Sequence, residues 1–219
     1  MRKTAALFIV LFFCSLLNAQ ELSFSLAAGA RRTSAVQGAG ISAEARFEGL
    51  SLFMQTVEGK DNSLVLSYDL RQGSTLTHSF IVSASFFPHQ GGFATASYAF
   101  SQHIQYKWLF VNYAAGLQLG TIWSHYSDVH PLSISLMGRL AMGLNAPGFD
   151  ISLFITSLDK ERKSWKSTGL AGAELGLKLN ENVRLYTRAF AEFAELAMNP
   201  YFVVSAYSIS FGAVFKGQI

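Results

Sequence analysis

Large apolar residues alternate with small or polar residues along most of the chain after residue 20. Near the start, Leu22, Phe24 and Leu26 alternate with Ser23 and Ser25. A period of two is typical of a β-strand whose two faces meet different surroundings, because successive side chains point to opposite sides. Twelve segments follow this pattern, at about residues 21–31, 38–47, 50–58, 63–71, 76–87, 93–101, 106–120, 132–144, 149–157, 167–179, 183–194 and 203–216.

The pattern favours a barrel in a membrane, because a closed sheet is the only sheet that leaves no backbone donor unpaired in lipid. The connections between the segments agree with this fold. Those on one side, such as 121–131 and 158–166, are longer than those on the other, such as 48–49 and 102–105. Short periplasmic turns and longer outer loops are typical of outer-membrane barrels. We therefore predict an all-β fold, a transmembrane antiparallel up-and-down β-barrel of about twelve strands, with eight or ten strands as alternatives.

The register of one predicted hairpin supports this assignment. If the chain turns at residues 180–182, Leu185 faces Leu177 on the apolar side and Arg188 faces Glu174 on the polar side. Apolar residues should face one another across a strand pair, because a slip of one residue exchanges the two faces. The same test succeeds at residues 48–49 and fails at residues 72–75.

The first residues resemble an export signal. Arg2 and Lys3 precede an apolar run at 5–13, and a small residue, Ala19, stands where cleavage would occur. We predict a signal peptide over 1–19 and a single barrel domain over 20–219. Removal of the signal peptide would take away Cys14, the only cysteine, and would exclude disulfides and thiolate metal sites from the mature chain.

The composition agrees with a membrane barrel. Hydrophobic residues make up 50% of the chain and charged residues 14%, against about 25% charged residues in soluble domains. Without the two cations of the signal, 15 Lys and Arg residues stand against 14 Asp and Glu residues. This balance gives no reason to expect nucleic acid as a partner. Glycine-rich phosphate loops are absent from the sequence, and we expect no cofactor.

The final segment carries a recognisable series of outward residues. Tyr207, Ile209, Phe211 and Phe215, together with the export signal, resemble small bacterial outer-membrane proteins, whose last strand is an alternating assembly signal that ends in an aromatic residue. The resemblance implies export through the periplasm, residence in the outer membrane, and partners in outer-membrane lipid and the assembly machinery. This chain departs from the usual pattern because four residues follow Phe215.

Charged residues on the polar face are the candidates for function. In a narrow lumen, a cation and a carboxylate stabilise each other and also create fields that select ions. We expect a narrow passive channel for small solutes, or a structural protein that binds a host surface ligand without catalysis. The predicted lumen-facing charged residues are Glu44, Arg46, Asp69, Arg71, Arg139, Glu174, Lys178, Arg184, Arg188 and Glu192.

Two other functions are compatible with parts of the sequence. His125 and Ser127 share one face of an extended chain, as a lipid hydrolase would require, and His125, Asp128 and His130 contain donors that suit zinc. A polar outer loop explains the same residues, so we predict no catalytic and no metal site. A secreted, soluble β-barrel carrier is the third alternative, with its apolar face turned into a dry core.

Overall fold

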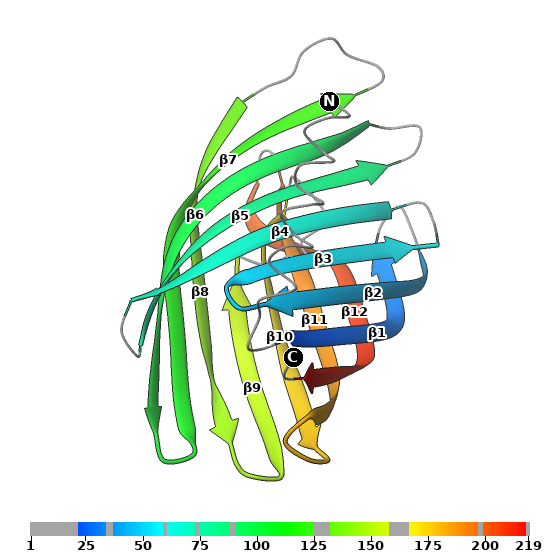
Figure 1. Cartoon of the computed structure of the whole chain (residues 1–219). Helices are drawn as coiled ribbons and strands as arrows, with labels where there is room; N and C mark the ends of the chain where they lie inside the picture. Colours follow the sequence, from blue (N-terminus) through cyan, green and yellow to red (C-terminus); the bar gives the residue numbers. More distant parts are fainter. Residues whose placement is uncertain are drawn as a thin grey trace, which may run out of the picture.

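Twelve strands make up the computed structural model (Figure 1), which describes residues 22–33, 37–58, 61–72, 75–87, 91–124, 132–157, 167–196 and 199–217. The predicted signal peptide lies outside these residues. The strands are β1 (Leu22–Thr33), β2 (Gln37–Phe47), β3 (Leu50–Val57), β4 (Asp61–Gln72), β5 (Leu76–Phe87), β6 (Gly91–Tyr106), β7 (Leu109–Ser124), β8 (Leu132–Asn145), β9 (Phe149–Thr156), β10 (Ser167–Lys178), β11 (Val183–Leu196) and β12 (Asn199–Gly217).

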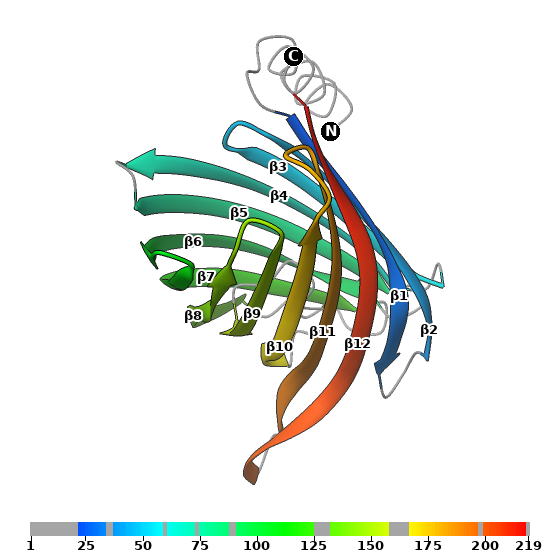
Figure 2. The same cartoon turned by 90° about the horizontal axis from the view of Figure 1, so that it is seen from below.

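The sheet closes on itself. Each strand pairs antiparallel with its neighbour in the chain, and β1 pairs with β12 from Leu22 opposite Gly217 to Thr33 opposite Ala206. Figure 2 shows β1, the first strand, beside β12, the last strand. The structure thus confirms an antiparallel up-and-down barrel of twelve strands.

Among the described residues, no helix is long and apolar enough to span a bilayer.

The register of the β10–β11 hairpin agrees with the sequence pattern. Leu177 lies opposite Leu185, and Glu174 lies opposite Arg188. The β2–β3 hairpin also has the expected pairing, with its turn at Glu48, whose φ of 49° is the left-handed conformation that tight hairpins require. The hydrophobic pattern therefore sets both the strands and their pairing.

Two predicted connections were wrong in position. The turn after β4 was predicted to start at Gln72, but Gln72 still pairs with Leu76, so the connection is one residue shorter. With the connection one residue shorter, apolar residues of β4 face apolar residues of β5, as the register test requires. The turn predicted at residues 102–105 instead lies at 107–108, where Lys107 has a φ of 53°, and residues 102–105 continue β6.

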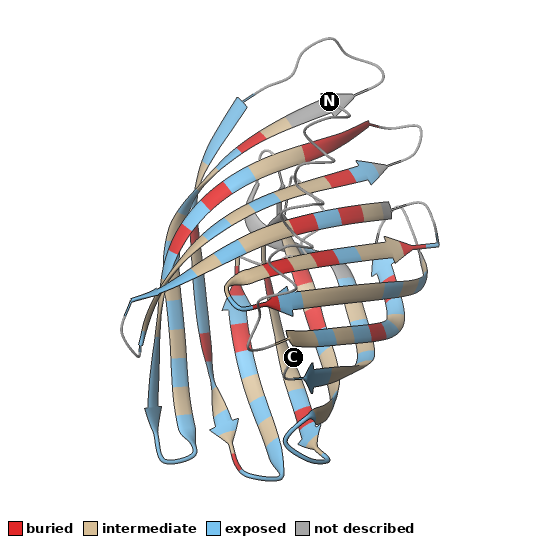
Figure 3. Cartoon of the chain, in the orientation of Figure 1, coloured by how far each residue is buried: buried red, intermediate tan, exposed pale blue. Residues whose placement is uncertain are grey.

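The two faces of the barrel differ in chemistry. Leu177, Leu185 and Phe211 are 52%, 41% and 60% exposed on the outer face, among many other large apolar side chains. Along β1, β7 and β9, exposed positions alternate with buried or half-buried ones (Figure 3). An apolar exterior suits contact with lipid, whereas a soluble carrier would turn this face into its core.

A cluster of apolar side chains fills part of the barrel interior. Phe154, Leu170 and Phe190 are buried and pack with Ala141 on the wall that β8, β9, β10 and β11 form. The open space of the lumen lies beside this cluster, because Ala141 and Phe154 also line it.

Candidate functional site: the barrel lumen

A cavity of about 920 Å³ lies in the lumen beside this cluster. It is lined from Phe110 to Thr121 along β7, which is most of the length of that strand. It also reaches Arg71 near the turn that ends β4. The cavity therefore extends between the two ends of the barrel.

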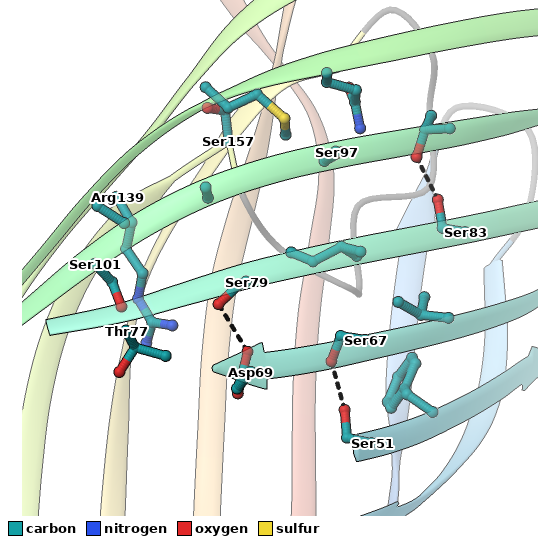
Figure 4. A pocket seen from close by; sticks show the side chains of 18 of the residues that line it. Ser51, Ser67, Asp69, Thr77, Ser79, Ser83, Ser97, Ser101, Arg139 and Ser157 are labelled. Carbon is teal, nitrogen blue, oxygen red and sulfur yellow. Dashed lines mark hydrogen bonds between the residues drawn. The ribbon is translucent and has the colours of Figure 1, made fainter. Parts of the chain in front are cut away.

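Hydroxyl groups form one wall of this cavity, on β3, β4, β5 and β6. The hydroxyls of Ser51 and Ser67 lie 2.7 Å apart, and the hydroxyl of Ser79 donates to the Asp69 carboxylate at 2.7 Å (Figure 4). Ser83 and Thr95 form a similar bond at 2.6 Å. Small hydroxyl side chains satisfy one another and leave room for water, because they project little beyond the backbone.

Most of the predicted lumen charges line this cavity. They are Glu44, Arg46, Asp69, Arg71, Arg139, Glu174 and Arg188. The Arg139 side chain extends from β8 towards the wall that carries Thr77 and Ser101 (Figure 4). Arg71 and Arg139 form no ion pair with another described residue, whereas Arg46 lies 3.9 Å from Glu44.

Two other predicted residues, Lys178 and Arg184, form hydrogen bonds at the short-turn end of the barrel. This end carries the turns at 48–49, 107–108 and 179–182. The Lys178 ammonium donates to the side chain of Asn145 and to the carbonyl of Ala146, at 2.5 and 2.7 Å. Arg184 donates to Glu174 at 2.7 Å and also to both carboxylate oxygens of Asp150.

Glu174 forms its ion pair with a residue other than the one opposite it in the register. Arg188 lies opposite Glu174 in the register, but the ion pair of Glu174 is with Arg184, because Asp150 and Glu174 converge on that guanidinium from β9 and β10. The Arg188 guanidinium lies over the Phe154 ring, 4.6 Å from its centroid. This placement holds a cation on the aromatic surface that bounds the cavity.

A buried ion pair lies towards the opposite end of the lumen. Arg31 of β1 and Glu192 of β11 approach to 2.5 Å, and each side chain is 2% exposed. Glu192 is among the predicted lumen-facing residues, whereas Arg31 and Asp150 are not. The alternation along the strands indicates the polar face for both, because Arg31 follows the lipid-facing Ala30 and Asp150 lies opposite Gly176 on the polar side.

The predicted assembly residues lie on the outer face of β12. Tyr207, Ile209, Phe211 and Phe215 are each at least 43% exposed. Recognition of these residues by an assembly machinery stays a prediction.

The residues of the hydrolase and zinc hypotheses, His125, Ser127, Asp128 and His130, lie outside the described part of the chain. Among the residues that the structure does describe, no three His, Cys, Asp or Glu side chains gather as a metal site would require.

The closed sheet, its apolar exterior and its polar lumen are those of a bacterial outer-membrane β-barrel. Solved structures with this fold include the NanC porin, which is 12% identical with a TM-score of 0.58 over 88% of this chain and 98% of that chain. They also include the KdgM porin, 12% identical with a TM-score of 0.53 over 87% of this chain and 98% of that chain. The likeness shows a shared fold. No family model and no curated protein matches the sequence.

Proposed function

We propose that this protein is a narrow passive channel that carries small hydrophilic solutes across the bacterial outer membrane and favours anions. The observation that supports a channel is the cavity of about 920 Å³ that follows β7 between the two ends of the barrel. A lumen filled by side chains, as in the smallest barrels, would leave no such path. The similar solved structures NanC and KdgM are porins rather than enzymes, which agrees with this proposal.

The balance of charge supports the preference for anions. Four arginines and three carboxylates line the cavity. Two of these carboxylates accept hydrogen bonds that hold them, Asp69 from Ser79 and Glu174 from Arg184. Arg71 and Arg139 have no such carboxylate partner among the described residues. The cavity therefore presents a positive field, which raises the local concentration of anions.

Current measurements in planar bilayers test the proposal. Purified protein should give discrete current steps, and under a KCl gradient the reversal potential should have the sign of chloride selectivity. The KdgM porin has been solved in complex with disordered oligogalacturonate, so galacturonate oligomers, beside neutral oligosaccharides of the same length, offer a defined pair of test solutes. We expect the acidic oligomer to interrupt the current more often. Absence of current at every voltage would remove the channel and leave a structural or surface-binding role.

A further inference from the structure

A second cavity of about 590 Å³ lies against the wall that β10, β11, β12 and β1 form. Most of its lining residues are lipid-facing and belong to two neighbouring rows. In the first row, Ala30 of β1 lies beside Ile209 of β12, which lies beside Ala189 of β11. Arg31, Gly172, Phe190 and Ser208, at alternate positions of the same strands, also line it. The predominance of lipid-facing residues places this groove on the outer surface.

The outer surface is uneven at this groove because its side chains differ in size. In the second row, Tyr207 stands between Arg32 of β1 and Ala191 of β11, and Ala171 of β10 follows Ala191. Tyr207 and Ile209 are 60% and 43% exposed and rise above the alanines on either side. The small alanine side chains beside Tyr207 and Ile209 let a hydrocarbon chain approach the backbone closely.

One end of the groove is polar. Arg32 is the second-to-last residue of β1, at the end of that strand opposite the short turns, and it is exposed on the lipid-facing side. A cation on this side is costly at the bilayer midplane but costs almost nothing near the interface. In the described part of the chain Arg32 forms no ion pair. Its guanidinium and the Tyr207 hydroxyl, side by side in one row, supply donors that suit a phosphate.

We propose that this groove binds a phosphate-bearing acyl lipid of the outer leaflet. The phosphate contacts Arg32 and Tyr207, and one acyl chain lies over the alanines beside Ile209. The charge of Arg32 complements an anionic headgroup, and the apolar lining complements the chain. Neither feature depends on solute passage through the lumen.

Binding of diphosphorylated lipid A to the purified full barrel in detergent tests this site. Arg32→Gln should weaken binding on the order of tenfold, because it removes a charge-assisted hydrogen bond. Ala191→Leu should weaken it similarly by filling the groove. Ala43→Leu is the matched control: it enlarges a lipid-facing alanine of β2 that lies opposite Leu26, outside the groove, and should leave the affinity unchanged.

Lipid A without phosphates separates the two halves of the site. The native barrel should bind it about as weakly as Arg32→Gln binds the phosphorylated lipid, and Arg32→Gln should lose nothing further. Heat-modifiable gel migration shows that each variant is folded. Unchanged binding in Arg32→Gln would overturn the phosphate contact. Equal losses in Ala191→Leu and Ala43→Leu would overturn the groove and indicate general contact with lipid.

Discussion

Removal of one partner from the buried Arg31–Glu192 pair should strongly destabilise the barrel. The pair joins β1 to β11 and passes over β12, so it spans the seam where the first and last strands meet. Its atoms lie 2.5 Å apart, and both side chains are 2% exposed. Glu192→Gln keeps the size of the side chain but removes the carboxylate charge that lies 2.5 Å from the Arg31 guanidinium. Loss of one partner of a buried pair costs about 3–5 kcal/mol in the free energy of unfolding.

Replacement of both partners should cost much less than this. In the double variant Arg31→Met/Glu192→Met neither charge of this pair remains, and the methionine side chains can pack against Phe190, over which the Arg31 guanidinium lies at 5.7 Å. Exchange of a buried pair for apolar residues of similar volume is close to neutral or stabilising. The free energy of unfolding of the double variant should therefore lie nearer that of the native barrel than that of Glu192→Gln.

Urea unfolding of the barrel in lipid vesicles, followed by tryptophan fluorescence, measures these free energies. Arg31→Met and Glu192→Met complete a double-mutant cycle, which isolates the energy of the pair from that of the separate side chains. A cost below about 1 kcal/mol for Glu192→Gln, as for exposed ion pairs, would refute the reasoning. A double variant less stable than either single variant would do so as well.

Three further substitutions test other parts of the structure. Arg139→Glu changes the cavity lining from four arginines and three carboxylates to three and four, so the reversal potential in a salt gradient should change sign from anion to cation selectivity. Gly212→Ala should destabilise the barrel by about 1–3 kcal/mol in urea unfolding, because its Cβ would lie 2.5 Å from the Tyr186 ring, whereas Gly217→Ala, with nothing within 4 Å, should be neutral. Leu117→Arg, midway along β7 on the lipid-facing side, should cost about 2–4 kcal/mol in the same assay, and no cost would contradict the assignment of the faces.

The sequence predicted the strands because the two-residue alternation follows directly from a sheet that faces lipid on one side and an aqueous lumen on the other. Where both faces are well marked, as at Leu177 and Leu185 of the β10–β11 hairpin, the register was confirmed as well. The pattern weakens near turns. At residues 102–105 polar side chains indicated a loop, but they continue β6, because hydrophilic residues are tolerated at strand ends near the interface.

Partners in the lumen were harder to predict than positions. The alternation places Glu174 and Arg188 on the same face, but long arginine side chains reach past their nearest neighbours. Arg184 thus takes both Glu174 and Asp150, while Arg188 lies on an aromatic ring. The apolar cluster of Ala141, Phe154, Leu170 and Phe190 was also not predicted, because a periodic pattern does not record how side chains of neighbouring strands pack inside the barrel.

The central claim is that solutes pass along the hydroxyl-lined wall of the lumen. Ser101 and Phe100 are neighbours on β6: Ser101 lines the cavity, and Phe100 is 43% exposed on the lipid-facing side. Ser101→Cys and Phe100→Cys can each be treated with a bulky, water-soluble thiol reagent during current recording, because the sole cysteine, Cys14, lies in the predicted signal peptide. The account predicts that the reagent reduces the current through Ser101→Cys and leaves Phe100→Cys unchanged. An unchanged current in Ser101→Cys, or a reduced current in Phe100→Cys, would contradict it.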